Sequence, residues 1–356
     1  MAKSVIKPII QPVKRLILRL SSLGDVILAT SALETNLLGE GQTHCQTDWV
    51  TGAEYAPLLR GHPRITKLWE FDRRLGFWGW WELSRLLWQK KYDEVYDLHR
   101  SLRTRLLRLY FIFWGLKEWT TLPRWKVIQK QYLRRIFYFI FKKYFPRRFR
   151  PQPMRRQFAK AVGGSGDEKT DLSHLLKIST PVDILKEFSI ETRPTYFCVM
   201  PSSRWSAKQW GTEKYFQAIQ SLGIFPVILG NDSDFESHRL VELLKYHWIP
   251  HLSGVGKWDL IQVAQVLSGS KGYFGNDTGL AHLAEALGKK AYVLFGPTTP
   301  DLGFGPWRAE SLAMGADLWC RPCGKDGRTC HRIFARYACM KELSVDQVVG
   351  KIRQSQ

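Results

Sequence analysis

A short polar string near residue 277 has the composition of an anion-binding site. Asn276-Asp277-Thr278-Gly279 lies between a strand expected at 271–275 and a helix expected at 279–287, with His282 in the first turn of that helix. Free backbone N–H groups and the positive end of the helix dipole bind anions such as a diphosphate. Asp277 or Thr278 could equally be a plain helix N-cap. The tetrapeptide alone leaves both interpretations open.

Four cysteines near the C-terminus have a spacing that a metal ion could use. Cys320, Cys323, Cys330 and Cys339 follow the pattern C-x2-C-x6-C-x8-C, and the chain has six cysteines in all. A structural tetrathiolate zinc site is chemically feasible with this pattern. Buried or redox-active thiols are the preferred interpretation, and nothing in the sequence brings these sulfur atoms to a reaction centre.

The elements that must position these residues alternate between strand and helix. Strands are expected at 13–20 and 95–98 and helices at 26–38 and 102–114. A clearer alternation follows residue 195. Its strands are expected at 196–200, 225–229, 271–275 and 290–295, and its helices at 211–222, 233–244, 258–267 and 279–287. Strands connected by helices form parallel sheets that are covered on both faces.

The length of 356 residues favours two domains rather than one. We expect an α/β domain at 1–175 and a second at 185–340, joined near the glycine-rich stretch 163–167, with a C-terminal helix within 341–356. In open α/β sheets, ligands bind beyond the carboxyl ends of the strands. The motifs of this sequence fall at such positions, which favours treating them as one set.

The net charge of +21 predicts a polyanionic partner: nucleic acid, anionic lipid or an acidic substrate. Residues 124–160 contain thirteen Lys or Arg residues, ten aromatic residues and no acidic residue. Within 131–145 the apolar residues recur at helical spacing, which suits docking on an anionic membrane surface. A core-facing helix with solvated cations and an RNA-binding surface are the alternatives.

No apolar run reaches the roughly 18 residues of a membrane-spanning helix. The N-terminus is basic and then hydrophobic, but Lys14, Arg15 and Arg19 interrupt the apolar run and no convincing cleavage site follows. We therefore expect a cytoplasmic protein whose cysteines are reduced or bind metal rather than form disulfides.

Two neighbouring stretches resemble a known signature. The first begins at Gly275 and continues through Asn276-Asp277-Thr278-Gly279-Leu280-Ala281-His282 to Gly288, and the second is Leu294-Phe295-Gly296-Pro297-Thr298. The signature is that of the ADP-heptose:lipopolysaccharide heptosyltransferase family. The resemblance implies an inverting glycosyltransferase of GT-B fold, with two facing Rossmann-like domains around an interdomain cleft. It also implies that Asp277, Thr278, Gly279 and His282 line the donor pocket.

Further stretches match the same family in order. The stretch 201–210 resembles the start of its second domain, which implies donor contacts from Ser202 and Ser203 and from a lysine, Lys208. A cation there would stabilise the departing nucleoside diphosphate. Residues 230–236 fit a ribose-binding position for Glu236. Asp232-Ser233-Asp234 also mimics the Asp-X-Asp motif of metal-dependent glycosyltransferases, but the surrounding pattern belongs to the other class.

The acceptor side is implied by two stretches of the first domain. Residues 19–28 resemble the family's first loop, in which Asp25 would be the catalytic base and Ser22 and Gly24 would contact the acceptor. Inverting transfer needs a carboxylate to take the proton of the attacking hydroxyl. The alternative for Asp25 is a helix-capping role. Residues 92–104 imply acceptor contacts for three basic residues: His99, Arg100 and Arg103.

The sequence thus predicts metal-independent transfer of heptose from ADP-heptose to the inner core of lipopolysaccharide by a monomer at the inner face of the inner membrane. No cofactor beyond the nucleotide sugar is expected. A related transferase that uses another nucleotide sugar or another anionic glycan is the nearer alternative. A basic nucleic-acid-binding protein is the more distant one. No strand is followed by G-x-G-x-x-G, which argues against a dehydrogenase.

Overall fold

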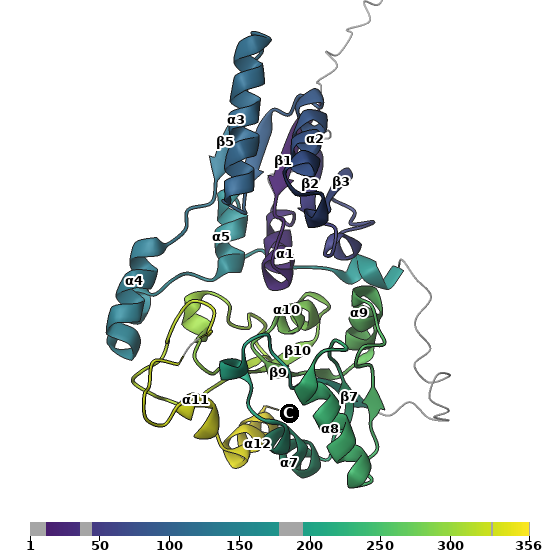
Figure 1. Cartoon of the computed structure of the whole chain (residues 1–356), viewed down its shortest axis with the longest axis vertical. Helices are drawn as coiled ribbons and strands as arrows, with labels where there is room; N and C mark the ends of the chain where they lie inside the picture. Colours follow the sequence, from purple (N-terminus) through teal and green to yellow (C-terminus); the bar gives the residue numbers. More distant parts are fainter. Residues whose placement is uncertain (1–11, 36–44, 178–194, 329, 356) are drawn as a thin grey trace, which may run out of the picture.

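Two parallel β-sheets, one in each of two lobes stacked along the long axis, dominate the architecture (Figure 1). The computed structural model describes residues 12–35, 45–177, 195–328 and 330–355. The predicted α/β protein with two parallel sheets is confirmed. The expected boundary between 175 and 185 adjoins residues 178–194, which lie outside the described residues, so that boundary stays a prediction.

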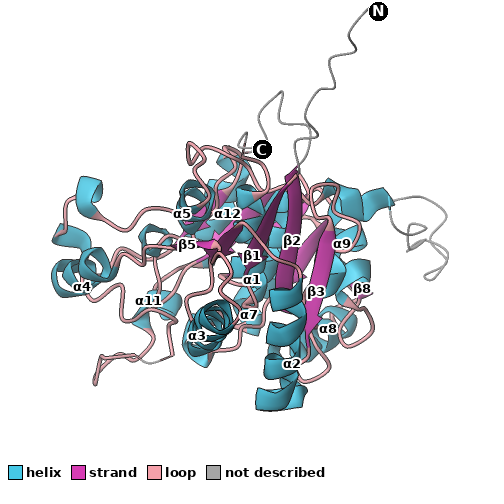
Figure 2. Ribbon diagram, turned by 90° about the horizontal axis from the view of Figure 1, so that it is seen from above, coloured by secondary structure: helices cyan, strands magenta, loops and turns pink. Residues whose placement is uncertain are grey.

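The first sheet has five parallel strands in the order β3-β2-β1-β4-β5. Helices cover both of its faces, which Figure 2 shows from above. Because both faces are buried, the strands are apolar on both sides: Leu16, Ile17 and Leu18 of β1 are all buried. The strands are β1 Val13–Leu18, β2 Cys45–Gly52, β3 Lys67–Phe71, β4 Glu94–Asp97 and β5 Arg124–Val127, and the helices are α1 Leu23–Ala29 and α5 Met154–Ala161 on one face and α2 Gly76–Gln89 and α3 Leu102–Lys117 on the other.

The second sheet has six parallel strands in the order β11-β10-β9-β6-β7-β8. Its two buried faces carry separate apolar clusters, one on the side of the first lobe and one on the far side. The strands are β6 Tyr196–Met200, β7 Phe225–Ile228, β8 Leu252–Ser253, β9 Gly272–Asn276, β10 Lys290–Leu294 and β11 Leu312–Met314. The helices are α9 Leu260–Gly269 and α10 Gly279–Ala286 on the near face and α7 Thr212–Leu222, α8 Phe235–Tyr246 and α12 Val345–Gln354 on the far face.

The basic segment 124–160 divides into three parts with different surroundings. Strand β5 pairs with β4, and α5 buries Phe158 against the first sheet. Helix α4 (Tyr132–Phe141) lies between these two elements in the sequence and projects to one side of both lobes (Figure 1). Only the ends of the segment therefore belong to the core.

The stretch after α5, expected to be a linker near 163–167, is packed against both lobes. Leu172 and Leu175 are fully buried together with Leu58 of the first lobe and the near-face core of the second. The His174 imidazole is 3.1 Å from the carbonyl oxygen of Leu58. This connection therefore helps to hold the lobes together.

Candidate active site

The carboxyl ends of the strands of the two sheets face one another, and α1 of the first lobe contacts α10 of the second. A Cβ atom placed on Gly24 would lie 2.9 Å from Cδ2 of His282 and 3.5 Å from Cα of Gly279. A Cβ atom on Gly279 would lie 2.8 Å from the Leu23 side chain. Both positions need glycine because the helix ends approach so closely. The first turn of α1, where the predicted base Asp25 lies in place of the expected loop, therefore packs directly against the start of α10.

Asp25 is held in place on the first lobe by a buried arginine. Its Oδ2 atom is 2.6 Å from Nη2 of Arg19 and accepts a hydrogen bond of 3.1 Å from the Ser22 hydroxyl. The backbone N–H of Ser22 also donates to Asp25, 3.4 Å away, which completes a capping box at the start of α1. Asp25 therefore caps α1, which was the alternative assignment for this residue, and it lies at the junction of the lobes.

Arg19 is buried, and burial lowers the pKa of its guanidinium while the charge of Asp25 opposes that shift. Its Nη1 atom donates to the carbonyl oxygen of Leu98 at 2.6 Å. Its Nε atom has no hydrogen-bond partner among the described residues. The negative charge of Asp25 is thus the principal compensation for a cation that water scarcely reaches.

Lys208 and Asp277 form an ion pair on the second lobe, with 2.6 Å between Nζ and Oδ2 and 12% of each side chain exposed. The Thr298 hydroxyl donates to the same carboxylate oxygen at 2.8 Å. Lys208 belongs to the 3-10 turn Ser206–Lys208, which follows β6, and Asp277 follows β9. The two residues predicted from separate motifs are therefore brought together.

His282 lies between these two pairs. The residue is buried, and its Nδ1 atom has no hydrogen-bond partner among the described residues. Burial lowers the pKa of the imidazole, and the charges of Asp277 and Asp25 act in the opposite direction. The His282 ring lies against Gly24 of the first lobe, and its burial favours the neutral form of the imidazole.

A cavity of about 700 Å³ opens beside this junction, at the carboxyl ends of β6, β7 and β9. Such a volume suits a small-molecule ligand. Of the predicted donor-binding residues, it is lined by Ser202, Ser203, Thr278 and Gly279, and α1 contributes Leu23. It is also lined by residues that had no predicted role, among them Arg204, Gln209, Asn231, Trp258 and Leu260.

Glu236 is not in the wall of this cavity. Its carboxylate accepts a hydrogen bond from the hydroxyl of Thr212 at the start of α7. Asp234, two residues earlier, lines the cavity and accepts a hydrogen bond from the backbone N–H of Asn231 at 2.7 Å. The loop that contains Glu236 thus contributes to the cavity wall through Asp234, and the ribose-binding role of this loop stays a prediction.

In the first lobe, His99 lies within electrostatic reach of the Arg19–Asp25 pair. Burial, assisted by the charge of Arg19, lowers the pKa of His99 to about 4, while the charge of Asp25 acts to raise it. Arg100 donates its backbone N–H to the Asp97 carboxylate at 2.6 Å and places its guanidinium over the Tyr132 ring. The Arg103 side chain is exposed, and its guanidinium lies over the ring of Phe71 at the end of β3.

A second cavity, of about 330 Å³, adjoins Arg100 at the carboxyl ends of β4 and β5. Arg105 and Arg108 of α3 line it together with Thr104, Trp125 and Gln129. Neither arginine forms an ion pair with a described residue. Both were overlooked because their i, i+3 spacing is ordinary for a solvated helix face, and only the fold brings that face to the strand ends.

The four C-terminal cysteines influence one another electrostatically, and burial raises the pKa of Cys339 to about 11. They are free thiols. Within the ranges that the structure describes, no three His, Cys, Asp or Glu residues are arranged to hold a metal ion. Asp232 and Asp234, of the Asp-X-Asp triplet, form no such group either.

The apolar stripe of α4 faces outward, so the alternative of a core-facing helix is wrong. Tyr138 is its one buried residue, and it hydrogen-bonds to Thr299 of the second lobe at 2.9 Å. The exposed apolar side chains are those of Leu133, Ile136, Phe137, Ile140 and Phe141. In the described part of the chain, no helix is both long and apolar enough to cross a bilayer.

Comparisons with known proteins agree with this geometry. The family model of glycosyltransferase family 9 (heptosyltransferase) matches residues 160–333. The chain is 25% identical over 337 residues to lipopolysaccharide heptosyltransferase 1 of Pseudomonas aeruginosa, covering 88% of this chain and 86% of that protein.

Solved structures show the same two-lobed fold. A glycosyltransferase family 9 protein from Veillonella parvula superposes with a TM-score of 0.73 at 18% identity, covering 97% of each chain. E. coli heptosyltransferase WaaC with ADP gives 0.67 at 20% identity, covering 96% of this chain and 100% of that one. The structure of the same enzyme with ADP-2-deoxy-2-fluoro heptose superposes with a TM-score of 0.64, at the same identity and coverage. The predicted GT-B fold is therefore confirmed.

Proposed function

Because the chain belongs to glycosyltransferase family 9, we propose that it transfers heptose from ADP-heptose to the inner core of lipopolysaccharide, with inversion at the anomeric carbon. That it is a glycosyltransferase follows from the family. The donor sugar, the acceptor and the roles of individual residues are our proposal.

The observation that carries the proposal is the approach of Gly24 to His282. It brings the first turn of α1, which carries Asp25, to the first turn of α10 in the other lobe, beside a cavity large enough for a nucleotide. Group transfer needs the acceptor's base and the donor's phosphates within one site. The packing of α1 against α10 supports such a site.

The donor would occupy the 700 Å³ cavity. Its diphosphate would lie at the start of α10, where the backbone N–H groups of Thr278 and Gly279 and the helix dipole favour negative charge. Ser202 and Ser203 lie in the same wall, and Asp234 takes the ribose-binding role in place of Glu236. The ligands of the similar E. coli heptosyltransferase WaaC, ADP and ADP-2-deoxy-2-fluoro heptose, support an ADP-sugar as donor.

The reaction would be a single displacement. The acceptor hydroxyl oxygen attacks the anomeric carbon, its proton passes to the Asp25 carboxylate, and the bond from the anomeric carbon to the diphosphate breaks to release ADP. Lys208 can donate to the departing diphosphate because an ammonium group has three N–H bonds and its one short contact is with Asp277. That cation takes the role that a metal ion has in other glycosyltransferases.

An anionic acceptor would lie on the first lobe. Ser22, Gly24 and His99 surround Asp25, while Arg100 joins the Arg105 and Arg108 cavity to this region. Arginine binds phosphate and carboxylate groups through a planar array of donors. Phosphorylated or acidic groups of the acceptor would therefore lie in this cavity. Arg103, which is exposed over Phe71, would contact the acceptor only at its periphery.

We further propose that the protein acts as a monomer at the cytoplasmic face of the inner membrane. The outward apolar stripe of α4, with Arg134, Lys142 and Lys143 beside it, supports docking on an anionic membrane surface. A lipid-anchored acceptor would then be presented next to the cleft.

The test is an ADP-release assay with heptose-deficient lipopolysaccharide as acceptor, in which ADP-heptose is compared with other ADP-, UDP- and GDP-sugars. We expect release of ADP with ADP-heptose and a product heavier by one heptose. If the protein released nucleotide only from another nucleotide sugar, the alternative of a related transferase would replace this proposal. Binding of nucleic acid without release of any nucleotide would contradict it.

A further inference from the structure

Helix α3 exposes an apolar stripe that nothing in the described structure covers. Its members are Leu102, Leu106, Leu109, Phe113 and Leu116, which are between 36% and 72% exposed. They recur at intervals of four and three residues, so they lie on one side of the helix. The members span α3 from its first residue to its last turn, and α3 extends along the first lobe to the end far from the second lobe (Figure 1).

The stripe is on the opposite side of α3 from the core. The buried residues Thr104, Leu107, Tyr110, Phe111 and Gly115 face the first sheet and α2. An ordinary surface helix has one apolar face, whereas α3 has two. Packing within the chain explains the first face only, so the second needs a different partner.

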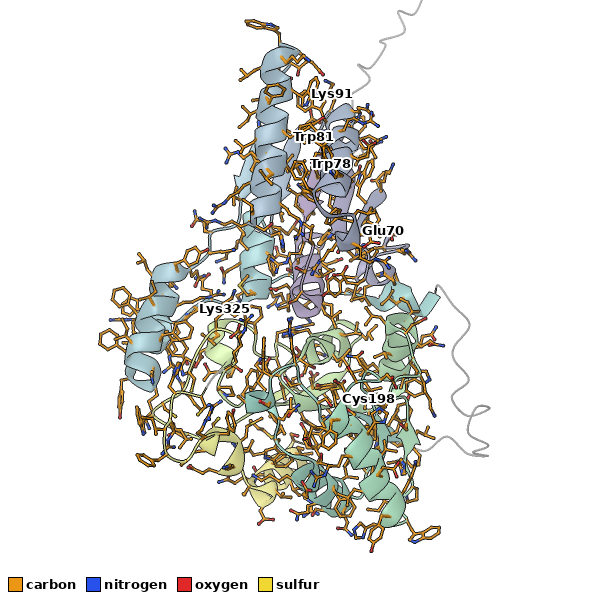
Figure 3. All side chains as sticks on the ribbon, viewed as in Figure 1. Glu70, Trp78, Trp81, Lys91, Cys198 and Lys325 are labelled. Carbon is orange, nitrogen blue, oxygen red and sulfur yellow. The ribbon has the colours of Figure 1, made fainter. Side chains whose placement is uncertain are left out.

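Exposed aromatic residues of α2 lie beside α3. Phe77, Trp78 and Trp81 are 55%, 77% and 44% exposed. Trp81 packs edge-on against Tyr110 of α3, with ring centroids 4.8 Å apart. Figure 3 shows Trp78 and Trp81 beside α3. The side chains of α2 and α3 therefore form one outer surface, which we call the α2–α3 face.

Unpaired cations flank the stripe on α3. Arg103 and Lys117 form no ion pair with a described residue, as is also true of Arg105 and Arg108, which our proposed function assigns to the acceptor, and the helix carries no acidic side chain. The nearby acids are already paired, since Glu82 binds Arg85 and Glu118 binds Lys91. The surroundings of the stripe are therefore positive.

We propose that the α2–α3 face docks on an anionic lipid bilayer, with the stripe among the acyl chains at the interface and the flanking cations at the headgroups. Tryptophan suits this boundary because its ring is apolar and its N–H is polar. Trp119, 95% exposed just beyond α3, adds to Trp78 and Trp81. This surface is additional to α4, which our proposed function already assigns to the membrane.

A second copy of the chain fits the face less well. A two-fold pairing of α3 would place the arginines of one copy against the same arginines of the other, with no free carboxylate nearby. An anionic bilayer matches both the apolar stripe and its positive borders.

The test is flotation of the full chain with vesicles of phosphatidylethanolamine and phosphatidylglycerol, and with vesicles of phosphatidylcholine alone. The variant Leu109→Gln/Phe113→Gln/Leu116→Gln removes the stripe with a good helix former. Leu109→Met/Phe113→Leu/Leu116→Met keeps it apolar. Tyr246→Gln/Ile333→Gln/Phe334→Gln removes comparably exposed apolar groups from the second lobe.

We expect the glutamine variant of α3 to lose at least about tenfold in partitioning to the anionic vesicles, and the other two variants to partition like the wild type. All variants should unfold at the wild-type temperature, because the substituted side chains are exposed. No donor is needed, so failure here is distinguishable from failure of the proposed function.

Equal partitioning of the wild type and the α3 glutamine variant would overturn the inference. It would also be overturned if the wild type showed a concentration-dependent increase in size that only this variant abolished, with no change in vesicle binding. That result would identify a second copy as the occupant.

Discussion

Replacing Asp25 with asparagine tests structure and chemistry together. The substitution keeps the size of the side chain but removes the charge that faces Arg19, whose side chain is only 8% exposed. Breaking a buried ion pair costs about 3–5 kcal/mol because the remaining charge is left without compensation. Asp25 is 19% exposed and water can partly replace it, so we expect a decrease of about 2–3 kcal/mol in the free energy of unfolding.

Arg19→Met separates the two effects. In the double variant Arg19→Met/Asp25→Asn no buried cation remains, so most of the lost stability should return. The turnover should not return, because the base is still absent. We expect kcat to be about 10²-fold or more below wild type in both variants that carry Asp25→Asn, with ADP affinity unchanged.

The measurements are urea unfolding followed by circular dichroism and tryptophan fluorescence, calorimetric titration with ADP, and the ADP-release assay. If Asp25→Asn unfolds at the wild-type urea concentration, Asp25 does not compensate Arg19 as the geometry indicates. If the double variant regains turnover together with stability, Asp25 is a structural residue and not the base.

Three further predictions concern the second lobe and the junction. Lys208→Met removes a charge-assisted donor, so ADP should bind about 10–100-fold more weakly by calorimetry; unchanged affinity would exclude Lys208 from the donor site. Gly24→Ala brings a methyl group to 2.9 Å from the His282 ring and should cost about 1–3 kcal/mol, whereas Gly350→Ala, in open space on α12, should cost nothing in the same urea experiment. Burial raises the pKa of Glu285 to about 7, so protonated Glu285 stabilises the fold below pH 4.5. This contribution, up to about 3 kcal/mol, is lost as the pH rises to 7. Glu285→Gln should flatten the dependence of the free energy of unfolding on pH over that range, and an unchanged dependence would contradict the assignment.

Much of the fold could be predicted because parallel strands buried on both faces leave continuous apolar runs. The strand expected at 271–275 is β9 Gly272–Asn276, and the helix expected at 102–114 is α3 Leu102–Lys117. Strand β5 was overlooked, since its alternating cations in Arg124–Val127 hide an edge strand.

The site could be predicted only at the level of loops. The sequence identified the loop at 230–236, but which acid of that loop faces the cavity depends on the hydrogen bond from Thr212, more than twenty residues away in the chain, to Glu236. Helical spacing likewise shows that an apolar stripe exists, as in 131–145, but not whether it faces the core or the solvent. Contacts across the chain decide such questions, and periodicity does not contain them.

The glycine-to-histidine approach between α1 and α10 has a kinetic consequence. The two helix ends meet through the Leu23 side chain and the His282 ring, so any rotation that widens the gap between the lobes also withdraws Asp25 from the start of α10. On the proposed roles, an opened molecule can exchange ligands but cannot react, and a closed one can react but retains its ligands. Separation of the two helix ends would then limit the rate of turnover, and kcat should decrease as the viscosity of the solvent rises.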